Sequence, residues 1–148
     1  MRYTGLSPEG DFEARPLKPL PHRWLRQAEG DLEAARNSLE GGHYEWACFQ
    51  AQQSAEKALK ALLYQQGFTS MFTHSVADLV LEASKSFAEI GRVESEAKLL
   101  DTFYLATRYP NALASDRAPV DYYSREEAER CLSSAESILT AVKSCMQD

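Results

Sequence analysis

The sequence predicts a single all-α domain, an antiparallel up-and-down bundle of four to five helices. Long segments carry apolar residues at alternating steps of three and four, and capping-box sequences precede two of these segments. No segment shows the strict alternation of apolar and polar residues that is typical of strands. The 148 residues are 44% hydrophobic and 26% charged, so the chain is long enough and apolar enough to bury a core without structural staples.

The start of the chain differs in composition from the rest. Prolines and glycines are frequent there, and both disfavour helix and strand interiors. We therefore interpret residues 1–21 as a proline-rich linker or tail and residues 22–148 as the helical domain. A linker in this position leads us to expect that the domain belongs to a larger protein.

Two helices are expected in the first half of the domain. An apolar stripe over 25–39 predicts the first helix, which Gly41 and Gly42 end. The second helix is expected over 44–66 and ends at Gly67. It carries two adjacent apolar stripes, which predicts a central helix that touches several neighbours.

The second half begins with a capping box, in which a serine oxygen accepts a free backbone N–H and a carboxylate reaches back to the cap. Ser75 and Asp78 form this pattern and open a third helix that is expected to reach Phe87. Gly91 is expected to break or kink it, and the helical period then resumes until Pro110 prevents its continuation.

The last helix follows a predicted loop over residues 110–123. Ser124 and Glu127 form a second capping box, and the apolar period then runs to Val142. Pattern and caps agree along this segment, which completes the predicted bundle.

Charge and hydropathy exclude several classes of function. A net charge of −6 argues against a surface built for duplex DNA or RNA, because phosphate binding needs an excess of Lys and Arg. No run approaches the roughly 20 apolar residues of a membrane span, and the first residues have no apolar signal-peptide core. We expect a soluble, cytoplasmic protein.

The cysteines and histidines do not form metal-binding motifs. The three cysteines sit in apolar helical stretches, as reduced core cysteines do, and the three histidines are too far apart for a metal-binding pair. These residues are Cys48, Cys131 and Cys145, and His22, His43 and His74. We therefore expect no metal site.

The most unusual local sequence is the phrase that runs from Thr107 to Asn111. It places the fixed cation Arg108 at the predicted end of a long helix, followed by an aromatic ring, Tyr109, and an amide, Asn111. Arg108 is suited to phosphate binding, but it also suits the negative end of the helix dipole, with Pro110 supplying the stop. The sequence leaves both interpretations open.

Two further cationic candidates lie elsewhere in the chain. Lys57 and Lys60 can form a cationic edge, although Glu56 stands four residues before Lys60 and is spaced to pair with it on the surface. His74 immediately precedes the third helix, whose N-terminus can attract an anion.

Four segments together carry a resemblance to a known family. They are Trp24 to Ala35, Trp46 to Leu62 with its Ala-Glu-Lys-Ala-Leu-Lys-Ala-Leu run, His74-Ser75-Val76, and Arg108-Tyr109-Pro110. In this order and separation they resemble the HEPN (higher eukaryotes and prokaryotes nucleotide-binding) domains over roughly residues 22–145.

The resemblance implies a helical bundle that forms a symmetric homodimer and binds a nucleotide at a cationic cavity near the interface. GTP is the suggested ligand for one member of the family that this chain resembles, a domain of a large co-chaperone. Ribonucleases of the family instead use an arginine, a gap of four to six residues, and a histidine. Here Arg108 is followed by Leu113, Ala114 and Ser115 at those positions. Acid–base cleavage of RNA needs a group that exchanges a proton, which arginine does not do.

We therefore expect a noncatalytic module of a larger chaperone-like protein that binds GTP or another nucleotide and forms a homodimer, without a cofactor. Its expected nucleotide contacts are Arg108, Lys57, Lys60, Asn111, Tyr109 and His74. A structural dimerisation or protein-docking domain is the alternative, with Trp46, Phe72, Tyr122 and Tyr123 as candidates for an apolar surface patch. A toxin-like ribonuclease that uses His74 with Arg108 is a third interpretation.

Overall fold

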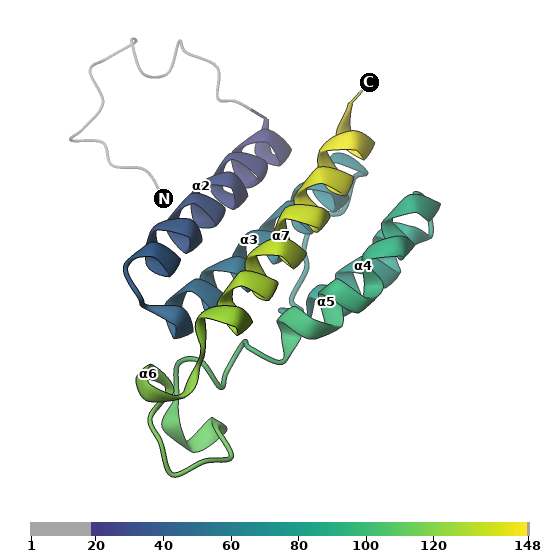
Figure 1. Ribbon diagram of the computed structural model, residues 1–148. Coiled ribbons are helices and arrows are strands. Elements are labelled where there is room, and N and C mark those ends of the chain that lie inside the picture. Colours follow the sequence, from purple (N-terminus) through teal and green to yellow (C-terminus); the bar gives the residue numbers. More distant parts are fainter. Residues whose placement is uncertain (1–18, 148) are drawn as a thin grey trace, which may run out of the picture.

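The computed structural model describes residues 19–147, and every regular element in that range is a helix. The predicted helical bundle is confirmed (Figure 1). The elements are α2 (Leu20–Glu40), α3 (Tyr44–Gln65), α4 (Val76–Ser84), η2 (Ala88–Val93), α5 (Glu94–Asp101), η3 (Pro110–Ala112), α6 (Pro119–Tyr122) and α7 (Arg125–Met146). Residues 1–18 of the expected linker lie outside the described residues.

Helix α2 begins at Leu20, two residues before residue 22, where the sequence predicts the start of the helical domain. Pro21 lies in its first turn, where the missing N–H has no helical acceptor to lose. The predicted end is confirmed, because Gly41 is the C-cap and Gly42 takes a positive φ of 80° that favours glycine. The turn then leads directly into α3.

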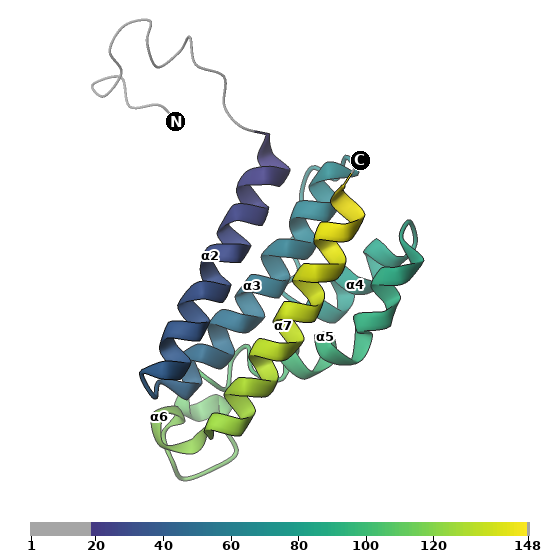
Figure 2. The same ribbon diagram turned by 45° about the horizontal axis from the view of Figure 1, so that its top comes forward.

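The long helices pack side by side in the order α2, α3, α7, and the shorter helices α4 and α5 lie beyond them (Figures 1 and 2). Helices α2 and α3 are antiparallel, because the short turn at Gly41 and Gly42 joins them. Helices α3 and α7 run in the same direction, since Gln65 near the end of α3 bonds the Met146 carbonyl near the end of α7. The α4–α5 hairpin between them makes this direction possible.

Helix α3 is the central helix that its two apolar stripes predict. It packs against α2, α4, α5, α6 and α7, and most of its residues are buried. Its many alanines let neighbouring backbones approach closely, while leucines fill the remaining space. The fully buried set in α3 includes Ala47, Cys48, Ala51, Ala55, Ala58, Leu59, Ala61 and Leu62.

The segment after α4 corrects two sequence predictions. The third helix ends at Ser84 rather than near Phe87, and Gly91 lies inside the 3-10 helix η2 instead of breaking an α-helix. Helix α5 stops at Asp101, and residues 102–108 form turns. Thr107 Oγ1 donates to the Phe103 carbonyl at 2.6 Å, which competes with helical bonding. Arg108 therefore does not lie at the end of a long helix.

The two capping boxes differ in the structure. The box at Ser124 and Glu127 is complete and opens α7. At α4 only half of the box forms, since Ser75 Oγ accepts from the Asp78 N–H while Thr73 Oγ1 takes the Ser75 N–H. The predicted loop 110–123 contains the short helices η3 and α6.

Helix length and hydropathy show whether a helix of the described residues could span a membrane. None of the helices within residues 19–147 is both long enough and apolar enough to cross a bilayer. The two 22-residue helices, α3 and α7, carry several charged side chains each. Their apolar residues face the bundle core instead.

Candidate functional site

Arg108 is held by aromatic rings rather than by a carboxylate. Its guanidinium carbon lies 4.4 Å from the ring centre of Phe49, 4.7 Å from that of Tyr104 and 5.0 Å from that of Tyr109. Its Nε donates to the Tyr104 carbonyl at 3.1 Å. Arginine stacks well on aromatic faces because its charge is delocalised and weakly hydrated. The group is thus fixed in place while its positive charge has no carboxylate partner among the described residues.

His74 contacts the same tyrosine from the loop before α4. Its ring stacks on Tyr104 with a centre-to-centre distance of 5.3 Å and an interplanar angle of 16°. Its Nδ1 lies 3.1 Å from Glu56 Oε2, and its backbone carbonyl accepts from Gln52 Nε2 at 3.0 Å. The Glu56 carboxylate favours a hydrogen on Nδ1. The other ring nitrogen, Nε2, has no such partner within residues 19–147, and the ring is largely exposed.

Glu56 and Lys60 form the pair that their spacing predicts, but the pair is buried rather than on the surface. Lys60 Nζ lies 2.8 Å from Glu56 Oε2, and the side chains are 7% and 6% exposed. Gln53 Nε2 donates to the other carboxylate oxygen at 3.2 Å. Both charges are therefore compensated inside the protein.

The other predicted contacts divide between the two sides of α3. Lys57 Nζ pairs with Asp31 Oδ2 of α2 at 2.6 Å, so it faces away from Arg108 toward the first helix. Tyr109 and Asn111 are exposed in the segment that follows Arg108. The structure brings His74, Arg108, Tyr109 and Asn111 to one region, and it gives both lysines internal partners.

The N-terminus of α4 does not offer an open anion position beside His74. Asp101 Oδ1 accepts from the Val76 N–H at 2.7 Å, and its Oδ2 accepts from the Ala77 N–H at 3.0 Å. The Ser75 hydroxyl also donates to Oδ2, at 2.9 Å. A carboxylate of the chain itself thus fills the place where the sequence suggested an external anion.

Exposed apolar and aromatic residues lie at the pocket that Arg108 lines, against its guanidinium, or close to it in sequence. Trp46, Leu105, Tyr109 and Val120 are each 47–62% exposed. Beside them lies a pocket of about 190 Å³ between the start of α3 and the segment around α6. We call it the Glu45 pocket, and its lining includes Glu45, Trp46, Arg108, Pro110, Pro119 and Val120.

Of the four aromatic residues predicted for a surface patch, two are exposed and two are partly buried. Phe72 is 89% exposed and Trp46 is 47% exposed, as a patch requires. Tyr122 and Tyr123 are instead partly buried against each other in an edge-to-face contact with ring centres 5.1 Å apart. Leu105 and Val120, which the sequence analysis did not single out, complete the exposed set around Arg108.

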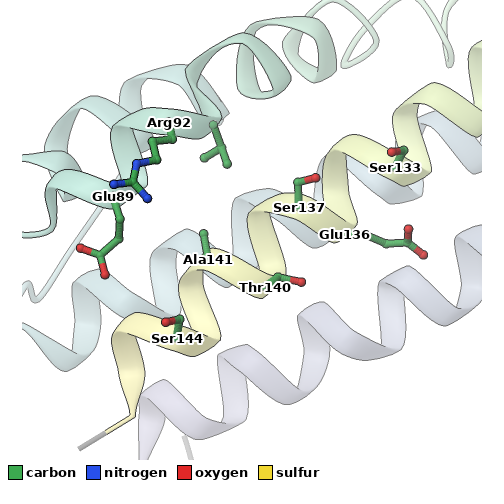
Figure 3. Close-up of a pocket in the computed structure, with 9 residues that line it drawn as sticks. Glu89, Arg92, Ser133, Glu136, Ser137, Thr140, Ala141 and Ser144 are labelled. Atoms are coloured by element: carbon green, nitrogen blue, oxygen red, sulfur yellow. The ribbon is translucent and has the colours of Figure 1, made fainter.

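A second concavity lies between η2 and α7 (Figure 3). It is an open groove of about 590 Å³ in which Glu89 and Arg92 face a row of small hydroxyl side chains on α7. That row comprises Ser133, Ser137, Thr140 and Ser144. It includes none of the predicted site residues, so the Arg108 region is the candidate functional site.

The cysteines behave as core residues, and the described residues hold no metal cluster. Cys48 and Cys131 are buried free thiols. Their mutual hydrogen bond and their burial raise the pKa of Cys48, which keeps its thiol protonated. Within residues 19–147, no three His, Cys, Asp or Glu side chains gather as they would around a metal ion.

The residues that connect the site were not among the contacts predicted from the sequence. Phe49 and Tyr104 support Arg108, and Tyr104 also carries His74. The available signal for Tyr104 was its place four residues before Arg108, a separation at which side chains meet on a helical turn. No comparable signal links Phe49 to Arg108, because they come from different elements.

Comparison with known proteins places the chain in a family. The family model of the HEPN domain matches residues 21–145, which include every residue of the candidate site. The chain belongs to the HEPN domain family. The resemblance that the sequence motifs indicate is therefore confirmed.

Two relatives of this HEPN domain differ greatly in size. MJ1304 of Methanocaldococcus jannaschii, named as a candidate toxin, is 29% identical over 136 residues, which cover 84% of this chain and 87% of MJ1304. Human sacsin is 29% identical over 128 residues, which also cover 84% of this chain but only 3% of sacsin. The same domain is thus similar to nearly all of one protein and to a small part of another.

A solved structure shares the fold of this chain. The crystal structure of TT1696 from Thermus thermophilus aligns with a TM-score of 0.81 and 37% sequence identity. The alignment covers 87% of this chain and 100% of TT1696. The helical bundle described above is therefore shared along nearly its whole length.

Proposed function

We propose that this HEPN domain is a noncatalytic module that binds a nucleotide of the GTP type and forms a homodimer. The observation that carries the proposal is the Arg108 guanidinium, which three aromatic rings hold at the protein surface. Its terminal N–H groups make no hydrogen bond to the described residues, so they are available to a phosphate in a bidentate arrangement. Tyr109, about half exposed, offers a ring on which a base can stack.

The proposed phosphate contacts leave out every predicted residue whose permanent positive charge is already paired within the described part of the chain. Arg108 and His74 meet at Tyr104, and Asn111 lies three residues beyond Arg108 in the exposed segment. Lys57 and Lys60 are ion-paired, so we leave them out of the proposed phosphate contacts. A phosphate would otherwise have to open a buried pair, which is costly.

The test is titration calorimetry with GTP, GDP and ATP on the wild type and on Arg108→Ala. Hydrogen bonds to a charged group contribute about 1.5–3 kcal/mol, so we expect at least a tenfold weaker Kd in the variant. Arg36→Ala, which removes an exposed arginine that pairs with Glu136, serves as the control and should bind normally. Absence of saturable heat in the wild type up to millimolar nucleotide would refute the proposal.

The proposed homodimer rests on the apolar surface around Arg108. Exposed aromatic and aliphatic residues gathered in one place are typical of protein interfaces. Leu105→Glu should separate the subunits, because it places a charge at an exposed apolar position three residues from Arg108. Light scattering that gives a monomer mass for the wild type at micromolar concentration would contradict this part.

The match to only 3% of sacsin supports the further proposal that the domain works inside a larger protein. We propose that this larger protein is chaperone-like, as the family resemblance implies, and cytoplasmic. The near full-length match to MJ1304 favours the opposite arrangement, a chain that consists mainly of this domain. If the dimer forms but no nucleotide binds, a structural dimerisation or docking role becomes the better explanation.

One observation favours a ribonuclease as a second candidate. His74 and Arg108 contact the same Tyr104 ring, and Glu56 orients His74 in the way that a carboxylate orients a catalytic histidine. Labelled single-stranded RNA incubated with the wild type and with His74→Ala tests it. If the wild type cleaves the RNA and His74→Ala does not, the domain is a ribonuclease and the noncatalytic proposal is wrong. If the RNA stays intact with both proteins, the noncatalytic proposal is supported.

A further inference from the structure

Glu45 is a buried carboxylate that the proposed function does not use. It lies in the first turn of α3 and is 7% exposed. Its carboxylate makes no hydrogen bond or ion pair with any residue in the described part of the chain. No side-chain oxygen in that part is both fully enclosed and unbonded, so the Glu45 oxygens are accessible to solvent, and Glu45 is one of the residues that line the pocket. These oxygens can therefore accept hydrogen bonds from a ligand that enters the pocket, in place of those from water.

The Glu45 pocket has the size of one planar ring system. Its volume is about 190 Å³. A cavity of about 150 Å³ holds a benzene molecule, whereas sites for whole small molecules run to about 300–1,000 Å³. Trp46, which is 47% exposed, borders the pocket with an aromatic face suited to stacking.

The charges of the lining restrict the chemistry of that ring. Glu45 needs hydrogen-bond donors, but Arg108 lines the same pocket and would repel an ammonium or guanidinium group. The fitting ligand is therefore a neutral ring with N–H donors on one edge. Two adjacent donors fit best, since the two oxygens of a carboxylate can accept two parallel bonds.

Among the common nucleobases, guanine has this edge. Its N1–H and its exocyclic amino group lie side by side, whereas adenine, cytosine and uracil place an acceptor next to their donor. We propose that Glu45 binds the N1–H and amino edge of a guanine base in this pocket and thereby selects guanine nucleotides. The inference rests on the proposed function, in which Arg108 at the same pocket contacts the phosphate, but it places the base against Trp46 instead of Tyr109.

The experiment compares GTP, ITP and ATP by titration calorimetry on the wild type. ITP is the sharpest probe, because its base lacks only the exocyclic amino group of guanine. The loss of one hydrogen bond to a charged acceptor should weaken binding by about tenfold or more. Glu45→Gln should bind GTP and ITP with similar Kd values, while Glu40→Gln, at the exposed end of α2, should keep the wild-type preference.

The outcomes separate this inference from the proposed function. Equal binding of GTP, ITP and ATP that still requires Arg108 would overturn the role of Glu45 and leave nucleotide binding intact. Absence of binding for all three nucleotides would overturn both. If Glu45→Gln does not fold, the ratio of the GTP and ITP Kd values in the wild type decides alone, and a ratio near one refutes the inference.

Discussion

The buried ion pair between Lys60 and Glu56 in α3 allows a quantitative test of whether Lys60 stabilises the fold. Lys60→Met preserves most of the apolar stem and removes the ammonium group that lies 2.8 Å from Glu56 Oε2. The Glu56 carboxylate, 6% exposed, then keeps His74 Nδ1 at 3.1 Å as a partner. Breaking a buried pair from one side costs about 3–5 kcal/mol of unfolding free energy. Because His74 remains, we expect a loss near the lower end, about 3 kcal/mol.

The chain provides a matched control for this substitution. Lys98 pairs with Glu94 at the same four-residue spacing, but the side chains are 67% and 45% exposed. Surface pairs of this kind contribute about 0.3–0.5 kcal/mol, so Lys98→Met should be nearly neutral. Urea denaturation followed by circular dichroism measures both variants under the same conditions.

A double variant separates the loss of the pair from the unpaired buried charge that is left behind. Lys60→Met with Glu56→Gln removes both charges, so it should recover part of the stability that Lys60→Met loses. Equal, small losses for Lys60→Met and Lys98→Met would refute the reasoning. Unchanged stability together with weaker nucleotide binding in Lys60→Met would show that Lys60 is a ligand contact, as the sequence first suggested.

Three further substitutions and titrations probe the rest of the fold. Asp101→Ala leaves two backbone amides of α4 without their acceptor, so it should lower the free energy of unfolding by about 2–3 kcal/mol. Hydrogen exchange at those amides should become faster, and unchanged exchange would contradict the capping role of Asp101. Burial, followed by nearby negative charge, raises the pKa of Tyr123 from 10.0 to about 12. The folded state therefore holds this proton where the unfolded state releases it, so stability should fall as pH rises from about 10 to 12, and Tyr123→Phe should flatten that fall. Burial also raises the pKa of Cys145 to about 11, so alkylation by iodoacetamide should be slow at neutral pH and accelerate toward that value.

Local signals in the sequence were sufficient where one interaction decides the backbone. The capping box at Ser124 and the glycines at 41 and 42 predicted helix boundaries that the structure confirms. The break before η2 was misplaced, because Phe87 continues the apolar period while its backbone is extended at φ −130° and ψ 96°. Phe87 packs against the core from that conformation. Apolar periodicity therefore reports burial, and burial alone does not fix the backbone.

The sequence singled out two residues of the candidate site, Arg108 and His74, but it did not reveal how they are connected. Arg108 and His74 stood out because of their local sequence context, and the structure brings them to a single ring. That contact depends on how the turns after α5 pack against α3 and on the path of the loop before α4, which are tertiary features. Helical spacing paired Glu56 with Lys60 correctly, yet it could not distinguish a buried pair from an exposed one.

The proposed phosphate contact requires an acidic chain to offer a local site for an anion, and the way in which Arg108 is held meets this requirement. A net charge of −6 opposes phosphate at long range, so attraction must come from a local positive charge that no carboxylate cancels. The lysines of α3 do not meet this condition, because Asp31 and Glu56 neutralise them. Arg108 meets it, since aromatic rings fix the guanidinium without neutralising it. Its affinity for phosphate should therefore depend on those rings as much as on the arginine itself.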